Sequence, residues 1–123
     1  MADGLSTANA NAALNAIVGV NASDLQLHTG APGANGTANV SSVTTREAVT
    51  WGSASGASVS TSNEPVWTSW AGTNGEVVTD VSSWSAPTSG TFGLSVQLAS
   101  SATMDTGDSL TITSLTITIT TAS

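Results

Sequence analysis

The chain has 123 residues, the length of one ordinary domain, which can bury a core without a metal ion or a disulfide. Eight Asp and Glu stand against a single Arg and no Lys, so the formal net charge is −7 at pH 7. We expect no nucleic acid and no membrane among its partners, because phosphate-rich surfaces are bound through clustered cations. The lack of Cys excludes disulfides and thiolate metal sites.

The composition predicts a mainly β fold. Val, Ile and Thr are frequent and four Trp are present, whereas disordered chains are poor in such residues. Thr-rich alternation is typical of strands whose outer face is solvated by hydroxyl groups. We expect an antiparallel β-sandwich or barrel-like domain with one short N-terminal helix. It would be a single domain over residues 1–123, with the helix at about 5–18 and the β-sandwich at about 24–122.

The first segment is the one helical candidate. Residues 5–18 are rich in Ala, Asp3 can cap the start, and Gly19 is suited to a left-handed stop. A stripe of small residues on this helix would allow close approach to a neighbouring subunit. The stripe consists of Leu5, Ala8, Ala12 and Ala16, with Leu14 and Ile17 beside it.

Short strands are predicted next. "DLQLHT" (24–29) alternates, with Leu25 and Leu27 on one face and Gln26 and His28 on the other. "VTTREAVTW" (43–51) is a second strand and "ASVSTS" (57–62) a weaker third. The segment 65–84 is predicted to be a hairpin that turns at Asn74-Gly75, followed by a strand at 91–100 and a turn at "MDTGD".

The last segment, "SLTITSLTITITT" (109–121), changes the parity of its apolar residues. Leu110 and Ile112 are even-numbered, whereas Leu115, Ile117 and Ile119 are odd-numbered. Either a bulge or bend at Thr113-Ser114 corrects the face, or both faces are buried, one of them against another subunit. Because the segment is uncharged and strongly β-forming, we expect it inside a sheet or an interface, with Ile117 and Ile119 largely buried.

The glycine-rich stretch "LHTGAPGANGTANV" (27–40) has no nucleotide-binding pattern. It contains no Lys, and it follows a strand without opening a helix. His28 is the only imidazole, and no motif pairs it with a nucleophile. Asp105 and Asp108 are too few carboxylates for calcium. We therefore predict a fixed surface loop, no cofactor, no metal and no enzymatic activity.

The four Trp residues have two interpretations. Aromatic rings of this size fill the core of a small sandwich, but an exposed ring can stack on a sugar. Trp51, Trp67 and Trp84 are assigned mainly to the core. Trp70, beside Ala71-Gly72, is the residue expected to be exposed and the candidate for glycan contact.

Several segments together resemble a known family. They are "MADGLSTANANAALNAI", "LQLHTGAPGANGTANV", a strand with Arg46 and Trp51, and a later "VWT". The chain is similar in these segments to small structural proteins from tailed phages of actinobacteria, usually labelled tail-fibre, minor tail or head-decoration proteins. The resemblance implies a virion structural protein, made in the host cytoplasm and placed on the outer surface of the particle.

Two positions on the virion follow from this resemblance. The first is a capsid decoration (minor capsid) protein that bridges major capsid protein subunits and stabilises the shell; a single short domain without shaft repeats favours it. It would be a homo-oligomer, with a trimer as first choice, because capsids offer three-fold sites. Its interface residues would be Leu5, Ala8, Ala12, Leu115, Ile117 and Ile119. The alternative is a tail-fibre or tail-tip adhesin domain that binds host-surface glycan.

Overall fold

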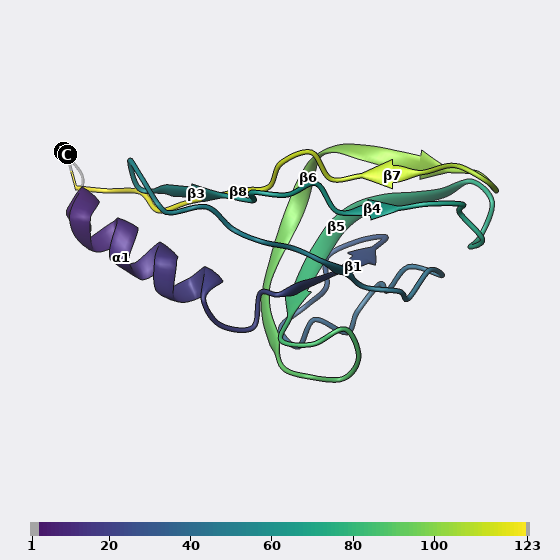
Figure 1. Ribbon diagram of the computed structural model, residues 1–123, viewed down its shortest axis with the longest axis horizontal. Coiled ribbons are helices and arrows are strands. Elements are labelled where there is room, and N and C mark those ends of the chain that lie inside the picture. Colours follow the sequence, from purple (N-terminus) through teal and green to yellow (C-terminus); the bar gives the residue numbers. More distant parts are fainter. Residues whose placement is uncertain (1–2, 123) are drawn as a thin grey trace.

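The computed structural model describes residues 3–122 and shows an elongated molecule with a wide body and a narrower extension (Figure 1). Body and extension are joined by several chain segments that run along the long axis. The helix is α1 (Thr7–Val18), and the strands are β1 (Asp24–His28), β2 (Glu47–Ala48), β3 (Ser58–Ser60), β4 (Val66–Trp67), β5 (Glu76–Trp84), β6 (Phe92–Met104), β7 (Leu110–Thr111) and β8 (Thr116–Thr118). The prediction of a mainly β, antiparallel fold with one short helix is confirmed.

The body is built on a four-stranded antiparallel sheet in the order β2-β1-β5-β6. All five residues of β1 are buried, including those that alternation would place on a solvated face. β1 pairs with β5 from Asp24↔Trp84 to His28↔Asp80, and β5 pairs with β6 over most of its length, with two register shifts. β1 is thus enclosed by strands on both sides and by packed groups on both faces.

A two-stranded ribbon of β4 and β7 packs against this sheet. Trp67 of β4 is paired with Leu110 of β7, and both side chains are buried. They meet Leu25, Leu27 and other sheet residues in one apolar cluster, so the core lies between ribbon and sheet. The cluster consists of Leu25, Leu27, Val49, Trp67, Trp70, Val78, Val81, Met104, Leu110, Ile112 and Leu115. This two-layer arrangement is sandwich-like.

The predicted hairpin over 65–84 is wrong in its pairing. β4 pairs with β7 and β5 pairs with β1 and β6, so β4 and β5 are not partners. The chain does turn at Gly75, whose φ is +81° and whose N–H donates to the Met104 carbonyl at 2.7 Å. A local turn signal specifies only that the chain changes direction. Which strand pairs with β5 depends on burial: β5 pairs with β1, all of whose residues are buried.

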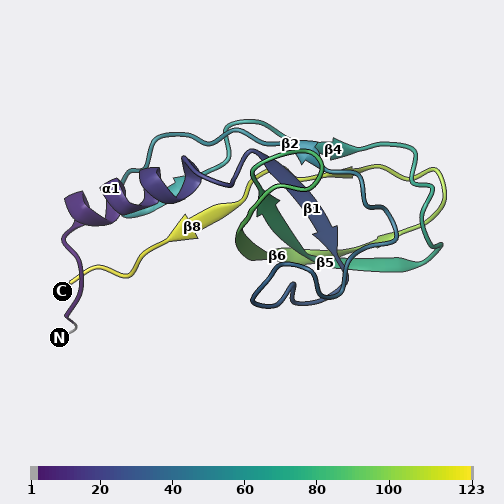
Figure 2. The ribbon, with the colours of Figure 1, turned by 90° about the horizontal axis from the view of Figure 1, so that it is seen from below.

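The extension consists of α1 packed on the two-stranded β3-β8 ribbon (Figure 2). The helix begins later than predicted, because Ser6 is the N-cap and its hydroxyl accepts a hydrogen bond from Asn9 N at 3.2 Å. Gly19 ends the helix with φ −81°, so the expected left-handed stop is wrong. Leu5 lies outside the helix and forms a parallel bridge with Thr121 near the C-terminus.

The packed side of α1 differs from the predicted stripe. Ala10 and Leu14, four residues apart, are fully buried, whereas Ala8 and Ala12 are exposed. Beside the buried pair, Asn11 Oδ1 accepts a hydrogen bond from Ala57 N at 2.8 Å. The helix is therefore held by one small apolar contact and by side-chain amides that bond to the backbone opposite.

The parity change in the last segment is resolved by a break in the strand. β7 ends at Thr111 and β8 begins at Thr116, and the chain between them turns its apolar side chains back into the core. Ile112 and Leu115 are both buried there. Ile117 and Ile119 are half-buried, which is less than expected, because the short β3-β8 ribbon is covered by α1 but not by a second full sheet.

Candidate functional site

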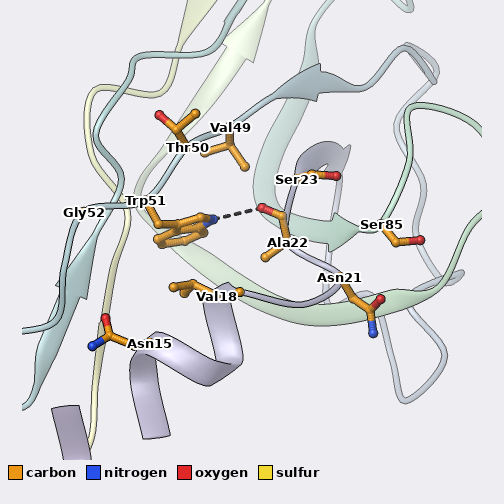
Figure 3. Close-up of a pocket in the computed structure, with 11 residues that line it drawn as sticks. Asn15, Val18, Asn21, Ala22, Ser23, Val49, Thr50, Trp51, Gly52 and Ser85 are labelled. Carbon is orange, nitrogen blue, oxygen red and sulfur yellow. Dashed lines mark hydrogen bonds between the residues drawn. The ribbon is translucent and has the colours of Figure 1, made fainter. Parts of the chain in front are cut away.

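A pocket of about 550 Å³ opens where the end of α1 meets the body (Figure 3). Its wall combines the C-terminal turn of the helix, the link into β1, and the segment 49–52 that follows β2. The lining residues are Asn15, Val18, Gly19, Asn21, Ala22, Ser23, Val49, Thr50, Trp51, Gly52 and Ser85. None of these side chains carries a charge.

The link between α1 and β1 is held in place through Asn21. This residue has φ +52°, and its carbonyl oxygen accepts a hydrogen bond from the Ser83 hydroxyl at 2.9 Å. Gly93 on β6 permits the contact, because a Cβ there would overlap the Asn21 carbonyl and approach the Ser83 hydroxyl to 2.7 Å. The main chain of Asn21 is thus bonded to the sheet, and the residue also lines the pocket.

Trp51 is the aromatic residue of the pocket. Its indole Nε1 donates to the Ala22 carbonyl at 2.9 Å, and its backbone forms an antiparallel bridge with Thr61. The side chain is half-buried and also packs against the core cluster. Figure 3 shows the ring between Val18 of the helix and the segment 49–50. The hydrogen bond to Ala22 uses the polar edge of the indole and fixes the ring in one orientation.

Two polar groups in the wall keep hydrogen-bonding capacity. Asn15 Oδ1 accepts from Ala54 N at 2.9 Å, which leaves the two N–H donors of its amide for other partners. Ser85 Oγ accepts from Thr91 N at 2.8 Å, which leaves its hydroxyl proton. The pocket therefore offers an aromatic ring and neutral donors, without charge and without an evident nucleophile.

His28 is a structural residue. Its side chain is 0% exposed, Nδ1 lies 2.8 Å from the Ala38 carbonyl and Nε2 lies 2.7 Å from Ser82 Oγ. Because a carbonyl only accepts, Nδ1 carries the proton, and the Ser82 hydroxyl donates to Nε2 while accepting from Trp84 Nε1 at 2.8 Å. Burial lowers the pKa of His28 below 6.5, and the Ala38 hydrogen bond and the charge of Asp80 oppose that shift. Every polar atom of the ring is used in holding the loop to the sheet.

The glycine-rich stretch forms a loop, as predicted from its turn residues, and the structure shows that this loop closes on itself. Thr29 N donates to Asn39 O at 2.8 Å and Ser41 N to Leu27 O at 3.0 Å, so the loop returns beside its own start. Gly36, with φ +71°, sits against the ring of Phe92, where a Cβ would not fit. The loop is fastened at its base by His28 and at its tip by Phe92.

The Trp residues are distributed differently from the prediction. Trp70 is only 2% exposed and its Nε1 donates to the Thr73 carbonyl at 3.1 Å. The expectation of an exposed Trp70 is wrong, because the chain folds this ring into the core and bonds Trp70 O and N to the 105–108 turn. Trp67 and Trp84 are buried as expected, and Trp51, assigned to the core, is the ring that lines a pocket.

Arg46, the single cation, is also used internally. Its guanidinium lies 4.2 Å from the Trp84 ring centroid, and its Nη1 donates to the carbonyls of Ala86 and Ser89 at 2.8 and 2.7 Å. Desolvation by burial lowers the pKa of Arg46, and the negative charge of Asp24 opposes this shift. Arg46 therefore fixes the 85–91 loop to the sheet.

The acidic residues Asp105 and Asp108 do not form a metal site. Asp108 Oδ2 accepts from Asp105 N at 2.9 Å, which makes the acidic pair a turn contact. Among residues 3–122, no three His, Asp or Glu side chains are grouped as metal ligands would be. In the same part of the chain, no helix has the length and apolar character needed to cross a bilayer.

A comparison with known protein families shows which family the chain belongs to. A model of the family described as "Podophage GP4 fiber I protein gp80" matches residues 4–120, which is nearly the whole fold. The chain belongs to this family. Membership confirms the coarser part of the resemblance, a phage virion protein of the fibre type, whereas the actinobacterial source and the head-decoration position are not part of it. No curated protein matches the sequence.

The residues proposed for subunit contact lie in three settings in this fibre-family fold: exposed, in the core, or half-buried beside a second cavity. Leu5, Ala8 and Ala12 are exposed, while Leu115 is 5% exposed and belongs to the core of its own chain. The half-buried Ile117 lines a second cavity of about 490 Å³. This cavity lies between the end of α1, β6 and β8 and is lined by Ile17, Leu94, Ser95, Val96, Gln97, Thr116, Ile117 and Thr118.

Proposed function

We propose that this protein is a non-enzymatic structural component of a phage fibre, on the outer surface of the virion. The observation that supports this most is the family match over residues 4–120, which extends across body and extension and not over one motif. The internal use of His28, Arg46 and the Asp105–Asp108 turn supports a structural role, because these groups are engaged in holding loops.

The fibre position is favoured over capsid decoration. The family description names a fibre, so it supports the adhesin alternative more than the decoration of a capsid lattice. The elongated shape also suits a fibre, because a narrow extension can attach to the particle while the wide body is displayed (Figure 1). In this role the body would meet the surface of the host cell.

Antibody labelling of intact virions tests this proposal. Gold-labelled antibody against the purified protein should decorate the tail region, where fibres are attached. Label arranged over the capsid surface would contradict the fibre position and favour the decoration function. As an activity control, the purified protein should leave host-surface polysaccharide at its original chain length.

We also propose that the chain associates with itself, with a trimer as first choice. β6 is a 13-residue strand at the sheet edge, without a charge or a Pro, and such edges are normally protected in monomers. It borders the uncharged cavity that contains Ile17 and Ile117. Copies of a chain with net charge −7 repel one another, so an uncharged surface is where they can meet at least cost.

A pair of matched substitutions tests self-association. Ile17→Asp places a charge in the cavity and should shift the sedimentation of the protein from oligomer to monomer. Val20→Asp is the control, because Val20 is 62% exposed and lies outside the cavity, and it should leave the oligomer intact. A wild-type protein that sediments as a monomer would contradict self-association, and an oligomer that survives Ile17→Asp would exclude this surface.

A further inference from the structure

We propose that the Trp51 pocket binds a neutral sugar ring of the host surface. This inference rests on the proposed function, since a fibre protein has to meet the cell surface. It differs from the expectation drawn from the sequence, in which Trp70 would contact glycan, because Trp70 is buried and Trp51 lines an open pocket. The pocket volume of about 550 Å³ is within the usual range for small-ligand sites, about 300–1,000 Å³.

The aromatic ring of the pocket is held in one orientation. One face of a sugar ring presents C–H groups, which pack on the flat face of an indole and exclude water there. Trp51 meets the requirement of rigidity, because the hydrogen bond from Nε1 to Ala22 O fixes the ring before any ligand arrives. Little conformational freedom of this side chain would be lost on binding. Val18 and Val49 extend the apolar part of the wall.

Neutral hydrogen-bonding groups line the same pocket as the ring. Asn21 lines the pocket while its carbonyl oxygen is bonded to the Ser83 hydroxyl, and the N–H donors of Asn15 remain after its oxygen has bonded to Ala54. An amide can donate to one sugar hydroxyl and accept from the next. Asn15 comes from α1 and Asn21 from the link after it, and Figure 3 shows them on opposite sides of Val18, at the two ends of the pocket wall.

The absence of charge selects the class of sugar. The eleven residues of the lining include no Asp, Glu, Lys, Arg or His. Acidic sugars would bring a negative charge to a chain of net charge −7 without a cation in the pocket to receive it. Hexoses and N-acetylhexosamines bring hydroxyl and amide groups instead, and these match the groups of the pocket.

The test uses the full chain and an array of neutral hexose and N-acetylhexosamine oligosaccharides, with uronic-acid oligosaccharides on the same array. We expect neutral sugars to bind, with the best one giving saturable shifts of the Trp51 indole signal in NMR titrations below about 10 mM. No binding in that range would overturn the inference, and so would a preference for the acidic oligosaccharides.

Two variants locate the site. Trp51→Leu should abolish binding, but Trp51 also packs on the core, so the second variant is Asn21→Gly. Glycine adopts the φ of +52° without strain and removes only the amide, and affinity should fall about five- to tenfold. Asn39→Gly is the matched control, because Asn39 also has φ +52° but lies outside the pocket, beyond the opposite end of β1.

The outcomes separate this inference from the proposed function. Sugar affinity that is unchanged in a folded Asn21→Gly or Trp51→Leu variant would place binding elsewhere and overturn the inference. Antibody label on fibres without sugar binding would defeat this inference alone. Sugar binding that depends on Trp51, together with label over the capsid, would defeat the fibre position and leave the site standing.

Discussion

The body on β1 and β5 and the extension on α1 are stabilised by different kinds of contact. In the body, Leu25, Leu27, Val78 and Val81 lie at 0–1% exposure within one large apolar cluster. The extension has a much smaller buried set, which consists of Ala10, Leu14, Ala57 and Val59. The difference shows how a chain of low charge can stabilise a narrow part of its fold without a core of its own.

Side-chain amides supply what the extension lacks in apolar contact. Asn11 and Asn15 lie one helical turn apart, and their oxygens accept from Ala57 N and Ala54 N. Asn lowers helix propensity, so these residues weaken α1 as an isolated helix and strengthen its attachment to the segment before β3. The body is stabilised mainly by the burial of apolar side chains, and the extension is stabilised mainly by hydrogen bonds from backbone N–H groups to side-chain amides.

The largest expected effect is in the body. Leu27→Ala should lower the free energy of unfolding by about 3–4 kcal/mol, because Leu27 is fully buried and the sheet around it cannot close the cavity. Denaturant unfolding followed by Trp fluorescence measures this change. Val77→Ala is the control on β5, since Val77 is 41% exposed and should cost well under about 1 kcal/mol.

The same substitution in the extension should act locally. Leu14→Ala also removes a fully buried side chain, and we expect about 2–3 kcal/mol. Here the loss should be confined to the extension, because Leu14 lies outside the cluster of the body. Hydrogen exchange should show lost protection in α1 and β3 with β1 and β5 unchanged. Equal loss of protection in β1 would contradict the division into two regions.

The amide contacts give a smaller effect. Asn11→Ala should cost about 1 kcal/mol, since the gain in helix propensity offsets part of the loss of a partner for the buried Ala57 N–H. Asn9→Ala is the matched control on the same helix: Asn9 is exposed, so this change should stabilise slightly. Thermal unfolding of the two variants measures the difference. If both raised the melting temperature, the amide would contribute nothing to the extension.

The smallest effect is a dependence on pH that belongs to the body. The pKa of folded His28 is lowered by burial, so the unfolded chain binds more protons once the pH falls below about 6.5. The contribution of neutral His28 to the free energy of unfolding is therefore fully present above about pH 6.5. It is lost as the pH falls through the folded pKa, by at most about 1.4 kcal/mol per pH unit. Unfolding of the wild type and of His28→Gln between pH 5 and 7.5 would show whether the slope requires the imidazole.

Local chemistry in the sequence was enough to predict much of the fold. The Ala-rich helix, the strand at 24–28, the glycine-rich loop and the turn at Gly75 all follow from propensity and turn residues. The pairing of β4 with β7 did not follow, because it joins segments more than 40 residues apart and depends on which faces are buried together. From the sequence alone, Ser6 can be interpreted as a helix cap, and Asn11 and Asn15 as residues that weaken a helix. The backbone groups that Asn11 and Asn15 bind lie more than 35 residues away and cannot be predicted from local sequence.

The candidate site was less predictable than the fold. The choice of Trp70 over Trp51 depended on small neighbours in the sequence, which say little about burial. What decides exposure is the position of α1: its last turn leaves a pocket beside Trp51, while the 105–108 turn bonds to the backbone of Trp70. A sequence signal did exist, since Trp51 ends the predicted strand 43–51 and precedes Gly52, but its value depends on a helix about 30 residues earlier.

The meeting of the two ends of the chain has a practical consequence. Leu5 and Thr121 form a bridge, and Ala122 N donates to Leu5 O at 2.9 Å. Leu5 and Thr121 lie at the tip of the extension, so a reporter fused beyond either of them would emerge away from the body (Figure 2). The same closeness would permit a circular permutant, with the old ends joined by a short linker and new ends opened between Pro87 and Thr88, which are exposed and lie between the two carbonyls that Arg46 holds. In that permutant, the order of the elements along the chain would change while each packing partner stayed the same.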